Sequence, residues 1–188
     1  MRVEENTSEI YQQAERVFGD HVLEVLQGEG PVRLYACKKQ NVRFYGFHVA
    51  AAPGMLTLYG DIGYAVLSVN SSHPEEWLCS SIDYRDYVID KIRAGKERVY
   101  YQEKIDNFYK PMEPDVVEEI QCRLEEGEDL ATAIFRVTGD LETDSILTGW
   151  SSDTLWIYEA LRCFMRLYIG RTSSTEVPKN ENNELTHH

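Results

Sequence analysis

The sequence predicts an α+β fold in which an antiparallel meander of about four to five strands packs against several helices. Apolar and polar residues alternate with a period of two between residues 21 and 70. Between residues 84 and 170 the apolar residues recur instead at the helical spacing of three to four. With 43% hydrophobic residues in 188, the chain can form a packed core, so residues 1–170 are expected to be a single domain.

The elements of the first half follow from this periodicity and from the turn residues between the runs. An amphipathic opening helix is expected over residues 7–18. Turn-forming pairs such as Pro53-Gly54 and the tetrapeptide Gly60-Asp61-Ile62-Gly63 separate short runs rich in Val, Leu, Tyr and Phe. The expected strands are His21–Leu26, Val32–Cys37, Val42–Val49, Met55–Tyr59 and Tyr64–Val69.

The second half predicts helices that stop at glycines, which favour the left-handed conformation found after a helix. The segment beyond Gly170 is polar and almost without apolar residues, so residues 171–188 are expected to form a disordered tail. The expected helices are residues 84–94, 116–126, 129–137 and 154–169.

Composition excludes several classes of function. The 32 acidic and 19 basic residues give a net charge of −13, which disfavours direct binding to the phosphate backbone of DNA. No apolar run approaches the about 20 residues that span a bilayer, and the acidic N-terminus does not resemble a secretion signal. The four cysteines form no CxxC pair, and no HExxH or similar metal motif is present. We therefore expect a cytoplasmic protein without a metal or other cofactor.

The negative charge is concentrated in one segment. Residues 113–144 contain eleven acidic residues and two arginines, a balance of −9, whereas residues 31–60 contain four basic residues and no acid. The acidic residues either solvate surface helices or form a ligand for a basic partner. The candidate partner-binding residues are Glu113, Asp115, Glu118, Glu119, Glu125, Glu126, Glu128 and Asp129.

An alternative site lies in the strand region. Asp61, between two glycines, could act as a ligand or general base, although Gly and Asp are also typical of a tight hairpin turn, which is the favoured interpretation. With His48, Arg33 and Arg43 it could form a site for a small ligand or an enzymatic reaction. The sequence contains no GxSxG elbow and no phosphate-binding loop, so no catalytic residue is assigned.

One part of the chain resembles a known group of proteins. Residues 44–49 form an aromatic strand, followed by Ala52-Pro53-Gly54, an apolar strand, Gly60-Asp61-Ile62-Gly63 and a second apolar strand that ends at Ser68. This order is similar to that of small, uncharacterised bacteriophage and prophage proteins with the pattern Trp-Pro-Gly and Gly-Asp-Met-Gly. Here Ala52 stands in place of Trp and Ile62 in place of Met.

The resemblance implies an accessory protein of a virus or mobile element that acts in a bacterial cytoplasm. Together with the acidic segment, it leads to the expectation of a non-enzymatic protein that binds a host protein with a basic groove. Inhibition of a nucleic-acid-handling defence system, of the anti-CRISPR or anti-restriction type, is one such function. The alternative is a small-ligand-binding protein or an enzyme that uses the sheet, and a homodimer remains open in either case.

Overall fold

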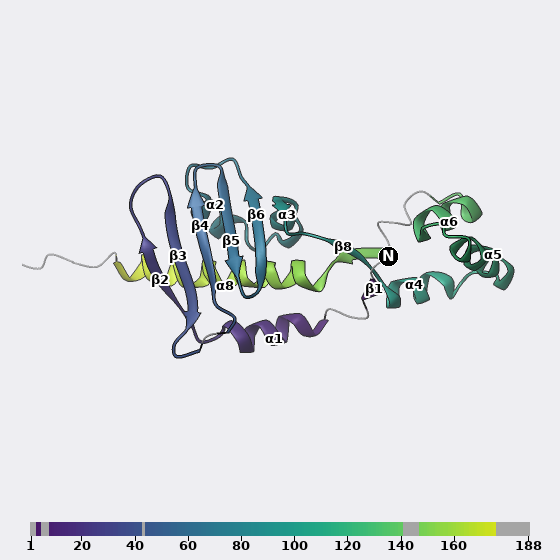
Figure 1. Ribbon diagram of the computed structural model, residues 1–188, viewed down its shortest axis with the longest axis horizontal. Helices are drawn as coiled ribbons and strands as arrows, with labels where there is room; N and C mark the ends of the chain where they lie inside the picture. The colour runs from purple at the N-terminus through teal and green to yellow at the C-terminus, as the bar shows by residue number, and fades with distance from the viewer. Residues whose placement is uncertain (1–2, 5–7, 43, 141–146, 176–188) are drawn as a thin grey trace, which may run out of the picture.

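The protein consists of a sheet lobe and a helical lobe at opposite ends of an elongated molecule (Figure 1). The structure, a computed structural model, describes residues 3–4, 8–42, 44–140 and 147–175. The sheet lobe contains a six-stranded antiparallel sheet with the order β2-β3-β4-β5-β6-β7. Its strands are β2 (His21–Gln27), β3 (Arg33–Lys39), β4 (Phe47–Ala52), β5 (Met55–Gly60), β6 (Gly63–Ser68) and β7 (Ile92–Ala94). The α+β prediction is confirmed, with a slightly larger sheet than expected.

The Gly60–Gly63 segment is a tight hairpin turn between β5 and β6. Gly60 and Gly63 have φ angles of 152° and 110°, which other residues rarely adopt, and they pair across the two-residue loop Asp61-Ile62. A Cβ atom on Gly60 would lie 2.5 Å from the carbonyl oxygen of Gly46. The Asp61 amide donates a hydrogen bond to that same oxygen at 3.0 Å. Both glycines therefore have a conformational role in this turn.

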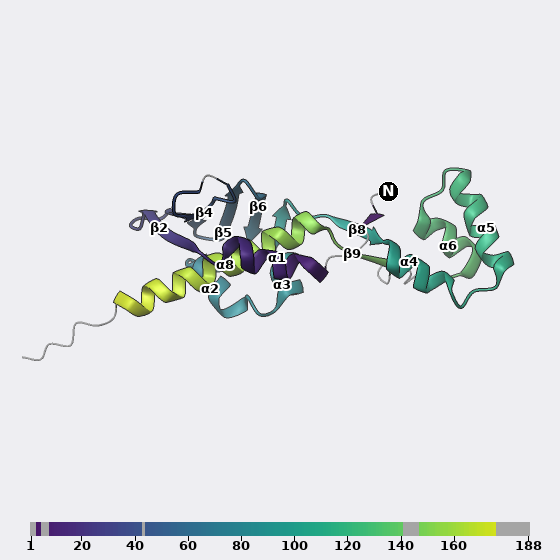
Figure 2. The ribbon, with the colours of Figure 1, turned by 90° about the horizontal axis from the view of Figure 1, so that it is seen from below.

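Helices cover one face of the six-stranded sheet and leave the other face open (Figure 2). The strands alternate accordingly: Leu56 and Leu58 of β5 are fully buried, and Thr57 between them is half-buried. Leu161 and Phe164 of the long C-terminal helix enter the same core. The helices of this lobe are α1 (Ser8–Phe18), α2 (Pro74–Ser81), α3 (Arg85–Asp90) and α8 (Ser152–Thr175).

A three-stranded sheet connects the sheet lobe to the helical lobe. It has the order β1-β8-β9, where β1 (Val3–Glu4) runs parallel to β8 (Arg98–Tyr101) and β9 (Thr148–Trp150) runs antiparallel to it. The helical lobe contains α4 (Gln102–Tyr109), α5 (Pro114–Glu125) and α6 (Leu130–Thr138). These helices have a hydrophobic cluster of their own, separate from the core beneath the large sheet, formed by Ile105, Ile120, Leu130, Ala133, Ile134 and Leu147.

Two element predictions in the sheet lobe are wrong. Residues 84–94 are not one helix, because α3 ends at Asp90 and Ile92 pairs with Leu67 of β6. A buried Ile92 suits a helix or a strand, and pairing with β6 satisfies the backbone groups along the edge of that strand. The strand predicted over residues 42–49 begins only at Phe47, because Tyr45 has a φ of 63°, which an extended strand does not allow.

The C-terminal helix is longer than the sequence predicted. α8 continues through Gly170 to Thr175, so the tail expected over residues 171–188 is helical in its first five residues. The hydroxyl of Thr172 donates to the carbonyl oxygens of Tyr168 and Ile169 at 3.2 and 3.0 Å, which supports this last turn. The rest of the predicted tail, residues 176–188, lies outside the described residues. Within the described ranges, no helix has both the length and the apolar character that crossing a bilayer requires.

Candidate partner-binding surface

The predicted acidic residues of α5 lie on one side of that helix. Five of the predicted acidic residues lie between positions 115 and 126. At 3.6 residues per turn, their carboxylates fall within an arc of about 120° around the helix axis. Ile120, which is fully buried, lies on the opposite side and packs into the core of the helical lobe. All five carboxylates belong to exposed residues. We call this set the acidic face of α5: Asp115, Glu118, Glu119 and Glu125 within the helix, and Glu126, its C-cap residue.

The other predicted carboxylates differ in their surroundings. Glu113 is exposed at the N-terminal end of α5. Glu128 is only partly exposed, and it forms ion pairs with Arg136 and, at 3.8 Å, with Arg123. Asp129 caps α6 by accepting a hydrogen bond from the backbone amide of Thr132 at 3.0 Å. Glu128 and Asp129 therefore stabilise the lobe itself, and their charges are already used within it.

Most carboxylates of the acidic face form no ion pair with another described residue. Glu119 forms an ion pair with Arg123 at 3.1 Å, one turn further along α5. For Asp115, Glu118, Glu125 and Glu126, the described part of the chain supplies no ion-pair partner. Four uncompensated charges on one helix repel one another, and a cationic surface placed against them removes that repulsion.

A shallow groove with an apolar floor adjoins the acidic face. It lies between α4 and α5 and has a volume of about 770 Å³. Its floor contains Tyr109, Met112 and Val117, which are partly buried, and its rim contains the exposed residues Asp106, Lys110 and Glu118. Neither α4 nor this groove is predicted by the sequence pattern, because the contact between α4 and α5 depends on the hydrophobic cluster of the helical lobe.

Tyr109 brings an unsatisfied polar group to this groove. Its hydroxyl oxygen is buried and has no hydrogen-bond partner among the described residues. Burial also raises the pKa of Tyr109, so the phenol stays neutral and keeps its proton. A buried hydroxyl without a partner is energetically unfavourable, and an acceptor brought by a bound molecule would satisfy it.

The alternative ligand site of the sequence analysis is not assembled in the structure. Arg33 lies on the helix-covered side, where its guanidinium forms an ion pair with the buried Glu75 of α2. His48 lies on the open side, stacked on Tyr59 with 5.1 Å between the ring centroids. Asp61 is exposed in the turn beyond β5, and Arg43 lies outside the described residues. Because Arg33 and His48 belong to opposite faces of the sheet, they cannot share a ligand.

Asp61 instead adjoins residues that are distant in the sequence. It lines a pocket of about 520 Å³ with Lys96 and Asp153, which come from the β7–β8 connection and the first turn of α8. The ammonium group of Lys96 is held by the carbonyl oxygens of Asp90 and Ile89 at 3.2 and 3.4 Å. The described residues contain no group of three or more His, Cys, Asp or Glu side chains able to hold a metal ion.

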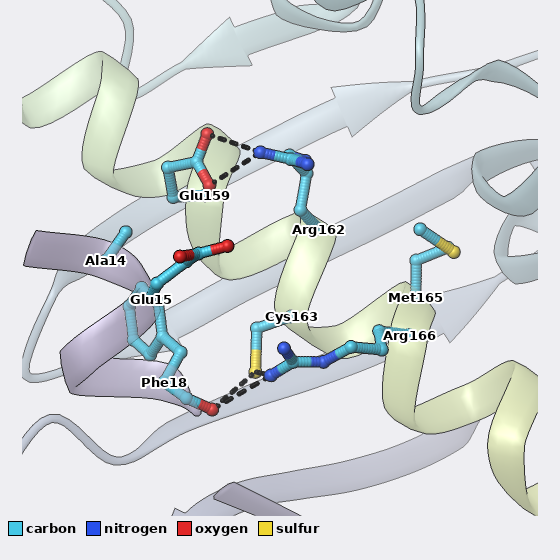
Figure 3. Close-up of a pocket in the computed structure, with 8 residues that line it drawn as sticks. All are labelled: Ala14, Glu15, Phe18, Glu159, Arg162, Cys163, Met165 and Arg166. Atoms are coloured by element: carbon cyan, nitrogen blue, oxygen red, sulfur yellow. Dashed lines mark hydrogen bonds and ion pairs between the residues drawn. The ribbon is translucent and has the colours of Figure 1, made fainter. Parts of the chain in front are cut away.

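A second small pocket lies between α1 and α8 and is held by internal polar contacts (Figure 3). Arg162 donates to both carboxylate oxygens of Glu159, at 3.2 and 3.1 Å. Arg166 donates to the carbonyl oxygen of Phe18 at 3.0 Å, and this bond fastens the end of α1 to α8. Burial raises the pKa of the nearby Cys163 thiol to about 11, so this cysteine is not a reactive thiolate. These contacts have a structural role.

Comparisons with protein-family models, with curated proteins and with solved structures return no match to this chain. The functional interpretation therefore depends on the geometry of the surface itself. Of the surfaces described above, the acidic face of α5 with its adjoining groove combines uncompensated charge, exposed position and an apolar floor. This combination is typical of a surface that binds another protein.

Proposed function

We propose that the protein is a non-enzymatic binding protein whose helical lobe engages a protein partner with a basic surface. The observation that carries this proposal is the acidic face of α5 beside the apolar groove, since four of its five carboxylates have no ion-pair partner in the part of the chain that the structure describes. The charges accelerate association with a cationic partner, and the groove supplies an apolar contact that slows dissociation of the complex.

We further propose that the partner is a nucleic-acid-handling protein of a bacterial host, whose cationic groove the acidic face occupies. From Asp115 to Glu126 the chain rises about 17 Å along the helix axis, so its five carboxylates are unevenly spaced, with a mean separation of about 4 Å. A strand of duplex DNA carries one phosphate per about 3.4 Å. A groove built for a phosphate backbone would thus meet a similar density of negative charge. A role against a host defence system is the expectation that follows from the sequence pattern of residues 44–68 alone.

The first experiment compares two variants that lose the same charge. Glu118→Gln, Glu125→Gln and Glu126→Gln together remove three of the five negative charges of the acidic face, and a control variant carries the same change at three exposed residues of the sheet lobe. The control residues are Glu9, Glu29 and Glu76. Proteins captured from a bacterial lysate by the wild-type chain are identified, and the affinity of each purified candidate is then measured at several salt concentrations.

The proposal expects a captured partner that binds the control variant like the wild type. The three Glu→Gln substitutions in the acidic face should lower the affinity of this partner by about tenfold or more. They should also make that affinity less dependent on salt concentration. Cys122 gives an independent readout, because it is exposed on α5 within the arc of the acidic face, so the bound partner should slow its alkylation. A partner that binds both variants equally and leaves Cys122 reactive would place the interaction elsewhere.

A further inference from the structure

A pocket between the two lobes gathers cationic side chains in this acidic protein. It has a volume of about 430 Å³ and lies where α3 meets the three-stranded sheet and α4. Arg98 of β8 and Lys104 of α4 form one wall, and Trp150 of β9 lies beside them. Pockets that hold small molecules usually have volumes of about 300–1,000 Å³ and often lie between domains.

Neutral groups hold both cations of this wall in place. The guanidinium of Arg98 lies over the ring of Trp150, 5.1 Å from its centroid. The ammonium of Lys104 donates to the carbonyl oxygen of Thr148 at 2.7 Å and lies 5.5 Å from the ring centroid of Tyr101. Neither cation has a carboxylate within ion-pair distance in the described part of the chain. Their charges are therefore positioned but not neutralised.

Close packing of Tyr101 against Gly149 holds the same wall in place. The ring of Tyr101 lies against Gly149, where a Cβ atom would be 2.2 Å from the ring. The Tyr101 hydroxyl donates to the carbonyl oxygen of Trp150. The indole nitrogen of Trp150 donates to Asp86 of α3 at 3.1 Å and thereby links the two sides of the pocket. A side chain at position 149 would displace Tyr101, so the pocket requires this glycine.

The opposite wall, on α3, carries the acceptors. The Asp86 carboxylate accepts a hydrogen bond from the Trp150 indole and forms an ion pair with Arg85, whose Nε lies 3.4 Å away. Asp90 also lines the pocket, and its carboxylate has no ion-pair partner among the described residues. Among the described residues, one wall thus presents two cations without a carboxylate partner. The other presents Arg85 together with the unpaired carboxylate of Asp90, which accepts hydrogen bonds from hydroxyl groups.

We propose that this pocket binds a small phosphate ester that also carries hydroxyl groups, such as a sugar phosphate or a ribonucleotide. Arg98 and Lys104 neutralise the phosphate, with the guanidinium as a planar donor and the ammonium as a point charge. Asp90 accepts from the hydroxyl groups and would repel a second anion, which selects a monoester over a polyphosphate. None of these residues belongs to the acidic face, so this site does not depend on the proposed function.

Titration with ribose 5-phosphate, followed by the indole N–H signal of Trp150 in a proton–nitrogen correlation spectrum, tests the site. The proposal expects a saturable shift of this signal, whereas ribose, which lacks the phosphate, should leave it unmoved. Inorganic phosphate should bind more weakly than the ester, and Asp90→Asn should reduce that preference. Adenosine monophosphate distinguishes a nucleotide from a sugar phosphate, because only a contact to the base would increase its affinity over that of ribose 5-phosphate.

Matched variants make the test decisive. Arg98→Gln with Lys104→Gln should lower the affinity for ribose 5-phosphate by at least about tenfold, which is the effect of losing a hydrogen bond to a charged group. Arg16→Gln removes a charge from an exposed position of α1 and should leave the affinity unchanged. Lys104→Gln alone, at an exposed residue, serves if the double variant does not fold. Equal affinity in the wild type and the pocket variants, or no saturable shift at all, would overturn the proposal.

Discussion

The ion pair between Arg33 and Glu75 is the most deeply buried charge pair among the described residues, and its removal gives a sharp test of the fold. The side chain of Glu75 is 2% exposed and that of Arg33 14%. Arg33 also donates through Nη2 to Glu75 at 3.0 Å, and the hydroxyl of Tyr35 donates to the same carboxylate at 3.3 Å. Glu75→Ala would therefore leave a guanidinium and a phenol without their acceptor between β3 and α2.

The size of the effect follows from this burial. Breaking a buried ion pair by removing one partner destabilises a protein by about 3–5 kcal/mol. Because Arg33 keeps some access to water, we expect the lower end, about 3 kcal/mol, for Glu75→Ala. Replacing both partners, as Arg33→Met with Glu75→Leu, leaves no buried charge and should cost about 1 kcal/mol or less.

Thermal and urea unfolding measure this effect against a matched control. Glu24→Ala breaks an ion pair with Lys38 in the same sheet, but those side chains are 48% and 55% exposed, so the loss should be about 0–1 kcal/mol. For a chain of this size, Glu75→Ala should lower the melting temperature by about 6–12 °C. If Glu75→Ala lowers the free energy of unfolding no more than Glu24→Ala does, the buried ion pair of Glu75 with Arg33 does not stabilise the packing of α2 on β3.

Three further predictions concern thiols, pH and capping. Cys122 is exposed whereas Cys37 is buried, so alkylation followed by mass spectrometry should modify Cys122 first and Cys37 only after unfolding; early modification of Cys37 would contradict the buried sheet core. Burial raises the pKa of Glu159 despite the neighbouring Arg162, so the folded state holds this proton more tightly and stability falls as pH rises through the raised pKa. Wild type should thus lose stability relative to Glu159→Gln as the pH rises above the ordinary pKa of a glutamate carboxyl group, measured in urea titrations at several pH values, and a difference independent of pH would rule this out. Asp129→Ala removes the cap of α6 and should cost about 1 kcal/mol in urea unfolding, with Asp129→Asn costing less; an unchanged midpoint would show that the cap does not contribute.

The two proposed sites occupy different parts of an unevenly charged molecule. The acidic face lies on α5, at the end of the molecule away from the large sheet (Figure 1). The cationic pocket lies at the junction, where Arg98 and Lys104 belong to β8 and α4. This separation allows one protein to bind a basic partner and a small anion without competition between the two ligands.

Local features of the sequence were sufficient to predict the meander and the concentration of acidic residues in the segment that forms α5. Each hairpin depends on neighbouring residues: alternation decides which side chains face the core, and glycines such as Gly60 and Gly63 permit the turn. The acidic residues of α5 are similarly placed by helical spacing alone, because Ile120 marks the buried side from within the same helix.

The tertiary structure alone decided those features that require two segments distant in the sequence to meet. Ile92 is a strand residue because the edge of β6 is available beside it, and Arg33 is unavailable to a ligand because Glu75 of α2 packs against it. Neither fact is visible in the apolar pattern, since the same spacing is compatible with a helix and the same arginine with a free surface. Apolar periodicity reports which side of a segment is buried, whereas the identity of the segment that buries it depends on long-range packing.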